Sequence, residues 1–501
     1  MDFLSETFAN IGFGLSVALQ PANLWYCFVG VFLGTFVGVL PGIGALTAIS
    51  LLFPLTFYMD PTAGLIMLAG VWYGTAYGGS IAAILINVPG TPSSAVTAID
   101  GYPLAKKGRA GVALFITATS SFIGGSIGIL LMMLFSPIIV DYALKFGSAE
   151  YFALMVLGLV AASTISGSSA AKNMAMILFG MAVGFVGLDI DTGDERFTFG
   201  IFALQDGIGL IPVVMGVFGL AEVIISVSNA GATKREDQAI NLKSMWPKRD
   251  EFVRSLFPTL RGAGIGSFFG TLPGTGPTIA SFMAYGVEKR FAKEPERLGH
   301  GAIEGIAAPE AANNAADQTA FIPTMTLGIP GSATMALMIG AMILHGITPG
   351  PSLMASHADV FWGLIMSFWI GNVLLLVLNV PLIGIWVRLL QVPYNMLFPA
   401  ILVLLCVGLY IVDGSIVALW VVFAFGVIGV FMRVAGLPAA SFLLGFVLGP
   451  MMEENFRRAL TISGGDYLTF VERPLSAVIL GIAFCLILFS GFSGLRHVVK
   501  L

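Results

Sequence analysis

The chain has 501 residues and a net charge of −4; 57% of its residues are hydrophobic and only 10% are charged. Its mean hydropathy is +0.93. Soluble globular domains carry roughly 25% charged residues, so this composition excludes a water-soluble surface over most of the chain. We therefore expect a membrane protein, and nothing in the composition points to nucleic acid as a partner.

Apolar segments are long enough to cross a bilayer as helices. A spanning helix needs about 20 apolar residues, and segments such as 110–137 and 474–490 approach or exceed this length. We predict an all-α polytopic membrane protein with about ten to twelve transmembrane helices. No Lys or Arg precedes Lys106. Because a cleavable signal peptide needs a positively charged start, we expect the N-terminus to belong to the mature protein.

An internal repeat divides the chain. Residues 34–44 (GTFVGVLPGIG) match residues 266–276 (GSFFGTLPGTG) at seven of eleven positions. A second Pro-Gly pair follows in each half, at 89–90 and 330–331. Because Pro-Gly in an apolar run removes a backbone donor and lets the chain turn, both pairs predict broken or re-entrant helices. The residues assigned to the first break of each half are Pro41, Gly42, Gly44, Pro273, Gly274 and Gly276.

The repeat sets the expected domain boundaries. We predict an N-terminal segment at 1–19, a first repeat at 20–230, a polar linker at 231–254, and a second repeat with the C-terminal helix at 255–501. The linker is rich in Lys and Arg. It is interpreted as a cytoplasmic connector that obeys the positive-inside rule, with a regulatory or partner-binding segment as the alternative.

Loop charges indicate that the two halves have opposite orientations. The loop near Asp60 lacks Lys and Arg, whereas its counterpart at 289–297 contains four of them. After the second break the bias reverses, with Lys and Arg at 106–109 and none at 345–352. Equivalent loops therefore face opposite sides of the membrane, which predicts an inverted repeat of the kind found in secondary transporters.

Hydroxyl residues follow the second break of each half. At the start of a half-helix, free N–H groups and the positive end of the helix dipole attract a carboxylate. Ordinary N-caps on structural kinks are the alternative. The residues expected to bind an anionic substrate are Pro89, Gly90, Thr91, Ser93, Ser94, Pro330, Gly331, Ser332 and Thr334.

The run 304–318 (EGIAAPEAANNAADQ) is the other polar concentration. On a helix, Glu310 shares one face with Asn313 and Asn314. Carboxylate and amide oxygens suit Na⁺ or a proton, so these three residues and Asn87 are predicted to couple transport to a cation. A polar loop outside the bilayer is the alternative. We expect Asp100 to pair with a lysine or to cap the next helix.

Other features argue against competing functions. The three cysteines and four histidines share no ligand spacing, so neither a disulfide nor a resident metal site is expected, apart from possible Na⁺. A membrane-embedded enzyme acting on lipid or prenyl substrates would need clustered reactive residues. The one acidic cluster, at 189–195, lacks a matching motif. An anion channel shares the helix breaks and stays an alternative.

Three segments resemble one transporter family. YGGSIAAILINVPGTPSSAVTAIDGYPLAKKGRAG (77–111), PEAANNA (309–315) and LGIPGSATMAL (327–337) resemble the large membrane subunit of tripartite tricarboxylate transporters, the TctA family. The resemblance covers essentially the whole chain.

The resemblance implies a permease subunit in the bacterial inner (plasma) membrane. Such a subunit works with a small four-helix membrane subunit (TctB type) and a periplasmic solute-binding protein (TctC type). It implies uptake of carboxylates, such as citrate or a related organic acid, by symport with Na⁺ or H⁺ and without enzyme activity or a cofactor. No P-loop sequence occurs in the chain, which agrees with a process not driven by its own ATP hydrolysis.

Overall fold

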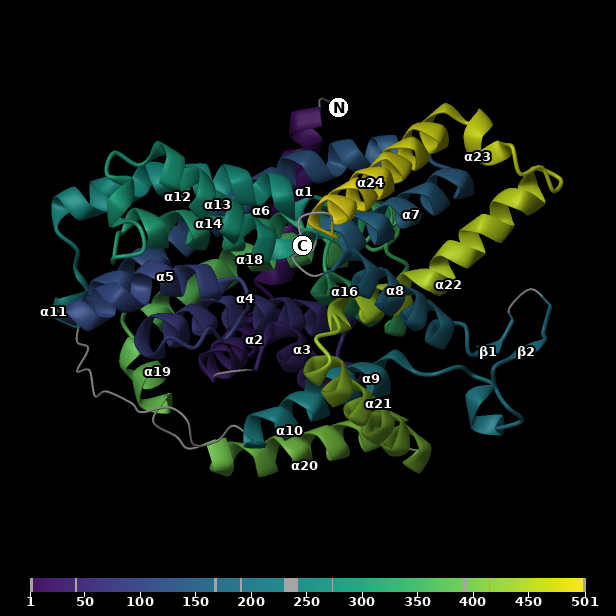
Figure 1. Cartoon of the computed structure of the whole chain (residues 1–501), viewed down its shortest axis with the longest axis horizontal. Helices are drawn as coiled ribbons and strands as arrows, with labels where there is room; N and C mark the ends of the chain where they lie inside the picture. The colour runs from purple at the N-terminus through teal and green to yellow at the C-terminus, as the bar shows by residue number, and fades with distance from the viewer. Residues whose placement is uncertain are drawn as a thin grey trace.

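The computed structural model describes residues 3–40, 43–165, 169–189, 192–228, 242–272, 274–390, 394–413 and 415–498. Helices dominate these ranges (Figure 1), which confirms the predicted all-α polytopic class. Within them, the only strands are β1 (Gly187–Leu188) and β2 (Glu195–Arg196), which form a short antiparallel pair.

The first half of the chain forms α1 to α10. Their bounds are α1 (Phe3–Ala18), α2 (Pro21–Val39), α3 (Ala45–Thr56), α4 (Pro61–Ile86), α5 (Ser94–Leu104), the π-helical turn η1 (Ala105–Arg109), α6 (Ala110–Ala143), α7 (Ser148–Ile165), α8 (Ala170–Gly184), the 3₁₀ turn η2 (Phe202–Leu204), α9 (Leu210–Val214), the π-helical turn η3 (Met215–Leu220) and α10 (Ala221–Ser228).

The second half forms α11 to α24. Their bounds are α11 (Leu242–Met245), α12 (Arg249–Gly270), α13 (Gly276–Phe291), the 3₁₀ turn η4 (Pro295–Arg297), α14 (Glu304–Thr319), α15 (Phe321–Leu327), α16 (Ala333–Leu344), α17 (Leu353–Ser356), α18 (Ala358–Asn379), α19 (Ile383–Leu389), α20 (Tyr394–Asp413), α21 (Ile416–Val434), α22 (Ala439–Ile462), α23 (Thr469–Glu472) and α24 (Pro474–Val498).

Among the described residues, six helical spans are long and apolar enough to cross a membrane. They are Pro21–Val39, Pro61–Ile86, Ser94–Ala143, Leu210–Val227, Ala358–Asn379 and Ile416–Val434. Shorter apolar helices such as α3 and α16 adjoin the breaks, as expected where a helix is interrupted inside a protein-lined region. The total of ten to twelve crossings stays a prediction.

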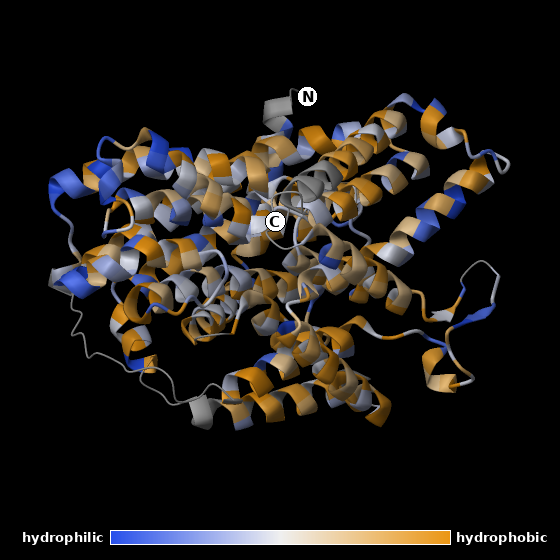
Figure 2. Cartoon of the chain, in the orientation of Figure 1, coloured by the Kyte–Doolittle hydropathy of each residue, from blue (hydrophilic) through white to orange (hydrophobic). Residues whose placement is uncertain are grey.

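Hydrophilic residues gather at two opposite ends of the molecule. In Figure 2 they lie mainly around α11 and the ends of α12 and α13 on the left, and around β1 and β2 on the right. Mostly hydrophobic helices fill the space between them. This distribution is what a lipid environment around the middle and water at both ends would select.

Glycines bring one helix against another in the same way in both halves. A Cβ added at Gly34 of α2 would lie 2.2 Å from the carbonyl oxygen of Val71 on α4, and one at Gly266 of α12 would lie 2.1 Å from that of Ala312 on α14. Such spacing leaves no room for a side chain, so only glycine allows these backbones to meet. The matching contacts are those of Gly30, Gly34 and Gly38 with Met67, Val71 and Thr75, and of Gly262, Gly266 and Gly270 with Ala308, Ala312 and Ala316.

The second breaks also occupy matching places. α4 begins at the side chain of Asp60, which accepts hydrogen bonds from the backbone N–H groups of residues 62 and 63, and it ends at Asn87 in the left-handed conformation (φ 56°). In the other half α15 ends at Gly328, also left-handed (φ 68°). A Cβ on Gly90 would approach the Gly38 carbonyl oxygen (2.2 Å), and one on Gly331 that of Gly270 (3.4 Å). The two halves therefore share one packing scheme.

Two positively charged loops meet at one end of the molecule. Lys107, which follows the second break of the first half, donates to the backbone carbonyl of His300, which follows the first break of the second half (2.7 Å). Inverted halves require these non-equivalent loops to lie on the same side. The contact agrees with the predicted inversion, which itself stays a prediction.

Candidate functional site

A cavity of about 760 Å³ lies where the helix breaks of both halves meet. Its wall includes the residues around both breaks of the first half (44–47 and 89–93), both breaks of the second half (274–279 and 332–334), and parts of α10, α14, α21 and α22. Such a volume lies in the range of small-molecule sites. The four breaks, far apart in sequence, therefore surround one space.

The second break of the first half is a compact hydroxyl-rich turn. The Ser94 hydroxyl donates to the Thr91 carbonyl (2.8 Å), and the Thr91 N–H donates to the Ser94 hydroxyl (3.3 Å). The hydroxyls of Thr91 and Ser93 lie 3.1 Å apart. Thr91 and Ser93 reach the cavity wall, whereas Ser94 does not. The serine that holds the turn is thus distinct from the residues that face the cavity.

The corresponding turn in the second half caps α16. The Ser332 hydroxyl accepts a hydrogen bond from the N–H of Met335 (3.3 Å), so Ser332 is an N-cap as well as a wall residue. The N–H of Gly274 donates to the carbonyl of Gly331 (2.9 Å), which ties the first break of this half to the second. The start of α16 therefore faces the cavity with its dipole and its hydroxyls.

The structure brings most of the predicted substrate-binding residues together. The members of this set that line the cavity are Pro89, Gly90, Thr91, Ser93, Ser332 and Thr334; Ser94, Pro330 and Gly331 stand outside the wall. Of the first-break residues, Gly44, Gly274 and Gly276 line it, whereas Pro41, Gly42 and Pro273 lie outside the described residues.

Glu310 lies away from the cavity wall. It is fully buried on α14 and accepts hydrogen bonds from Ser80 of α4 (2.7 Å), Ser121 of α6 (2.9 Å) and Thr97 of α5. One carboxylate therefore joins four helices. This arrangement confirms that the run 304–318 is a buried helix, not a polar loop.

The other predicted cation residues do not line the cavity either. The Asn314 amide donates to the Asn313 side-chain oxygen (2.5 Å) and to the Glu310 carbonyl (3.1 Å). Asn87 is exposed at the end of α4. The structure thus groups Glu310 with the two asparagines and leaves Asn87 apart from them, and their cation role stays a prediction.

Three charged side chains of the wall, Asp317, Arg433 and Glu222, lie outside the predicted site. Asp317, in the last turns of α14, is 2% exposed, and Arg433, near the end of α21, pairs with Glu222 of α10. All three line the cavity. Asp317 lay within the polar run. Its position two helical turns beyond Glu310, on the same side of the helix, could have drawn attention to it. Arg433 gave no comparable signal, because α21 is distant in sequence from every break.

Asp100 does not pair with a lysine or cap a helix, which contradicts the prediction. Its carboxylate accepts hydrogen bonds from the backbone N–H groups of Gly299 (2.9 Å), Gly301 (2.8 Å) and Ala302 (2.7 Å), and from the Tyr285 hydroxyl (2.9 Å). Three backbone amides and a phenol thus satisfy the buried carboxylate. Asp100 therefore fixes the loop that precedes α14.

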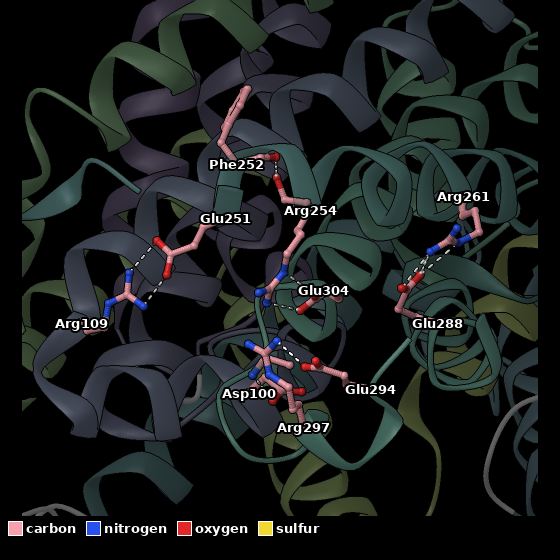
Figure 3. Close-up of polar contacts among 12 residues, drawn as sticks. Asp100, Arg109, Glu251, Phe252, Arg254, Arg261, Glu288, Glu294, Arg297 and Glu304 are labelled. Carbon is pink, nitrogen blue, oxygen red and sulfur yellow. Dashed lines mark hydrogen bonds and ion pairs between the residues drawn. The ribbon is translucent and has the colours of Figure 1, made fainter. Parts of the chain in front are cut away.

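Ion pairs gather at the charged end, and one of them, Arg109–Glu251, joins the first half of the chain to α12. In Figure 3, Arg109 faces Glu251, Arg254 faces Glu304 and Arg261 faces Glu288. The nearest N–O distances are 2.6, 2.9 and 2.7 Å. The Arg109 guanidinium lowers the pKa of the Glu251 carboxyl from its ordinary value. These charges lie outside the cavity wall and have structural partners.

The acidic run at 189–195 is likewise occupied by structural contacts. Asp189 pairs with Arg196 and with Arg457 (3.1 Å). Glu195 accepts hydrogen bonds from Thr198 (2.6 Å) and Gln205 (2.5 Å). Asp191 lies outside the described residues. These partners favour a structural role over the divalent-metal chemistry that a lipid-modifying enzyme would need.

Fold and site together define a polytopic helical membrane protein with a cavity at converging helix breaks, an architecture typical of transporters. Residues 24–444 match the Tripartite tricarboxylate transporter TctA family. The chain belongs to this family, and the resemblance noted in the sequence is confirmed.

Two curated proteins of Agrobacterium vitis are similar to this chain. The "Uncharacterized 52.8 kDa protein in TAR-I ttuC' 3'region" is 47% identical over 493 residues, 98% of both chains. The "Uncharacterized protein in TAR-II ttuC' 3'region" is 51% identical over 224 residues, 44% of this chain and 93% of that protein. No solved structure matches the chain.

Proposed function

We propose that this chain is the permease subunit of a binding-protein-dependent, ion-gradient-driven transporter of carboxylates, and that the cavity binds the substrate. The observation that carries the proposal is that residues of four helix breaks line one cavity together with one cationic side chain, Arg433. Family membership supports a tripartite assembly with a small membrane subunit and a periplasmic solute-binding protein.

The chemistry of the wall suits an anion. Hydroxyls of Thr91, Ser93 and Thr334 can donate to carboxylate oxygens, and the start of α16 adds free N–H groups and a positive dipole end. Arg433 offers a planar fork that matches a carboxylate. A substrate with two or three carboxylates could engage both turns at once. A tricarboxylate such as citrate has this form.

Transport across the bilayer then requires the cavity to open to each side in turn. In inverted-repeat transporters one substructure moves against the other around a fixed site. We propose the same here, with H⁺ or Na⁺ as the coupling cation, because co-binding a cation lowers the cost of desolvating a multivalent anion.

Uptake by proteoliposomes tests the proposal. The chain is co-produced with its small membrane subunit, reconstituted, and supplied with binding protein and labelled citrate or related di- and tricarboxylates. Ser93→Ala and Thr334→Val should each raise the half-saturation concentration about tenfold, since a hydrogen bond to a charged group contributes roughly 1.5–3 kcal/mol.

Thr119→Val is the matched control, because the Thr119 hydroxyl bonds the Phe115 carbonyl of its own helix (2.8 Å) away from the cavity. Unchanged kinetics in both wall variants would exclude the cavity as the substrate site. Counterflow of labelled substrate against unlabelled substrate would distinguish a carrier from an anion channel.

A further inference from the structure

Asp317 stands apart from the other buried acidic residues. Seven Asp and Glu side chains are buried in the described part of the chain: Asp100, Glu150, Asp189, Glu251, Glu288, Glu310 and Asp317. Six of them have arginine, hydroxyl or backbone amide partners. Glu150, for example, pairs with Arg473 (2.6 Å) and accepts from the N–H of Gly147 (2.8 Å).

Asp317 has no such partner. One of its carboxylate oxygens, Oδ1, is buried without any hydrogen bond within the described residues. The side chain is 2% exposed, yet it lines the cavity. Native proteins satisfy nearly all buried polar groups. Of the buried side-chain atoms without a partner in the described residues, Asp317 Oδ1 is the one that belongs to a residue of the cavity wall, where a ligand can reach it. If the Asp317 carboxylate were ionised here, no positive charge or hydrogen-bond donor of the described residues would offset the cost of removing it from water.

Among the described residues, the elements packed around Asp317 supply no positive charge to it. On its own helix the nearest acid is Glu310, which the hydroxyls of α4, α5 and α6 already saturate. Tyr73 of α4 donates to Gln318 (3.0 Å), and Tyr77 of the same helix donates to Asn372 (3.2 Å). From α12 and α13, Arg261 pairs with Glu288, and Tyr285 donates to Asp100 of α5.

Across the cavity, Arg433 pairs with Glu222, and no Lys or His is among the described residues of the wall. Asp317 therefore faces the space that an anionic substrate would enter, with its charge uncompensated. Bringing a second negative charge into this cavity is unfavourable unless a cation arrives with it.

The packing of the two halves shows that this carboxylate occurs once. Gly38 of α2 meets Thr75 of α4 as Gly270 of α12 meets Ala316 of α14, so the next residues, Ala76 and Asp317, are counterparts. Both line the cavity. The wall is thus equivalent in outline but carries a carboxylate on one side and a methyl group on the other.

We propose that Asp317 binds the coupling cation, one positive charge carried by a proton or by Na⁺, when the substrate anion occupies the cavity. The proton or ion comes from the water on the entry side, neutralises the carboxylate, and returns to water on the exit side without any covalent change in the substrate. This inference rests on the proposed transport function and assigns its coupling site.

The experiment uses the reconstituted chain with its partner subunits and labelled citrate as the probe. Accumulation is measured under an imposed pH gradient and, separately, under an imposed Na⁺ gradient at equal pH on both sides. Counterflow is measured without any gradient. Asp317→Asn, which keeps the shape but carries no charge, is compared with wild type.

We expect Asp317→Asn to lower gradient-driven accumulation at least about tenfold and to lower counterflow far less, since exchange needs no net movement of cation. The gradient that drives wild-type accumulation identifies the cation. Asp317→Glu should restore part of the accumulation, with a shifted dependence on pH or Na⁺. Glu304→Gln, at the opposite end of α14 and paired with Arg254, is the matched control and should behave as wild type.

Accumulation by Asp317→Asn at the wild-type level overturns the inference. So does equal loss of accumulation and counterflow in both Asp317 variants, because that result means a structural role. Failure of the wild-type protein to take up or exchange any carboxylate would instead contradict the proposed function, and the two failures are therefore distinguishable.

Discussion

Arg433 is the only cationic residue among the described residues of the cavity wall, and its guanidinium is paired with Glu222. In the proposed function, a substrate carboxylate replaces Glu222 at the guanidinium. Arg433→Gln removes a charge-assisted hydrogen bond of roughly 1.5–3 kcal/mol, so we expect the half-saturation concentration for labelled citrate to rise about tenfold to a hundredfold in proteoliposomes.

Arg433→Lys should recover only part of this loss, because an ammonium does not present the planar fork of a guanidinium. The control is Arg458→Gln, which breaks an exposed pair with Glu454 on α22 outside the cavity. If Arg433→Gln transports with wild-type kinetics, the Arg433–Glu222 pair has a structural role only.

The contrast between Glu310 and Asp317 shows how far the sequence could predict which buried carboxylate is open to a cation. Both lie in one polar run, and residue type alone favoured Glu310 beside its asparagines. Whether a buried carboxylate is satisfied depends on side chains from other helices, here Ser80, Thr97 and Ser121. That information is tertiary. A cation role for Glu310 stays a prediction, but its three donors leave it less open to a ligand than Asp317.

At the scale of helices, close approach through glycine is the feature most open to test. A Cβ at Gly266 would lie 2.1 Å from the Ala312 carbonyl oxygen, whereas one at Gly264, two residues earlier on α12, would meet nothing within 4 Å. Gly266→Ala should force α12 away from α14 and cost about 1–3 kcal/mol or more. The melting temperature of the detergent-purified protein should fall by several degrees.

Gly264→Ala makes the same chemical change on the same helix without a clash. It should leave the melting temperature unchanged or raise it slightly, since alanine is the better helix former. Equal melting temperatures for the two variants would show that α12 adjusts without loss and that the glycine contact is not required.

The helix breaks were predictable because Pro-Gly in an apolar run has a local physical effect that needs no knowledge of neighbours. The turns at 87–93 and 328–332 confirm the second breaks. The meeting of the two second breaks at one site was expected, because both were assigned to the substrate, whereas the first breaks were predicted only as helix breaks. The contribution of α10 and α21 to the cavity wall was not expected, because neither helix carries a Pro-Gly break.

At the scale of the whole molecule, the distribution of charged residues predicts how the chain is oriented in the membrane. Lys107 contacts the loop at His300 (2.7 Å), and the ion pairs of Figure 3 gather at this end. Positively charged loops remain in the cytoplasm, so we predict that this end is cytoplasmic. The loops at Tyr58 and Ser352, which occupy the corresponding places in the opposite halves, should then face the periplasm.

Single cysteines test this orientation. Cys27, Cys406 and Cys485 are first replaced by alanine, and cysteine is then introduced at Lys107, Lys293, Tyr58 or Ser352, all of which are exposed. In intact cells a membrane-impermeant thiol reagent that crosses only the outer membrane should label Tyr58→Cys and Ser352→Cys. Lys107→Cys and Lys293→Cys should react only after the cells are opened.

The four positions give a test that a single loop could not, because each half supplies one position to each side. An inverted repeat requires Lys107 and Lys293 to behave alike although they follow different breaks. A parallel repeat would instead pair Lys107 with Ser352, and Lys293 with Tyr58. Labelling in the parallel pattern would exclude the inverted arrangement, and the alternating access proposed here would then need a different symmetry.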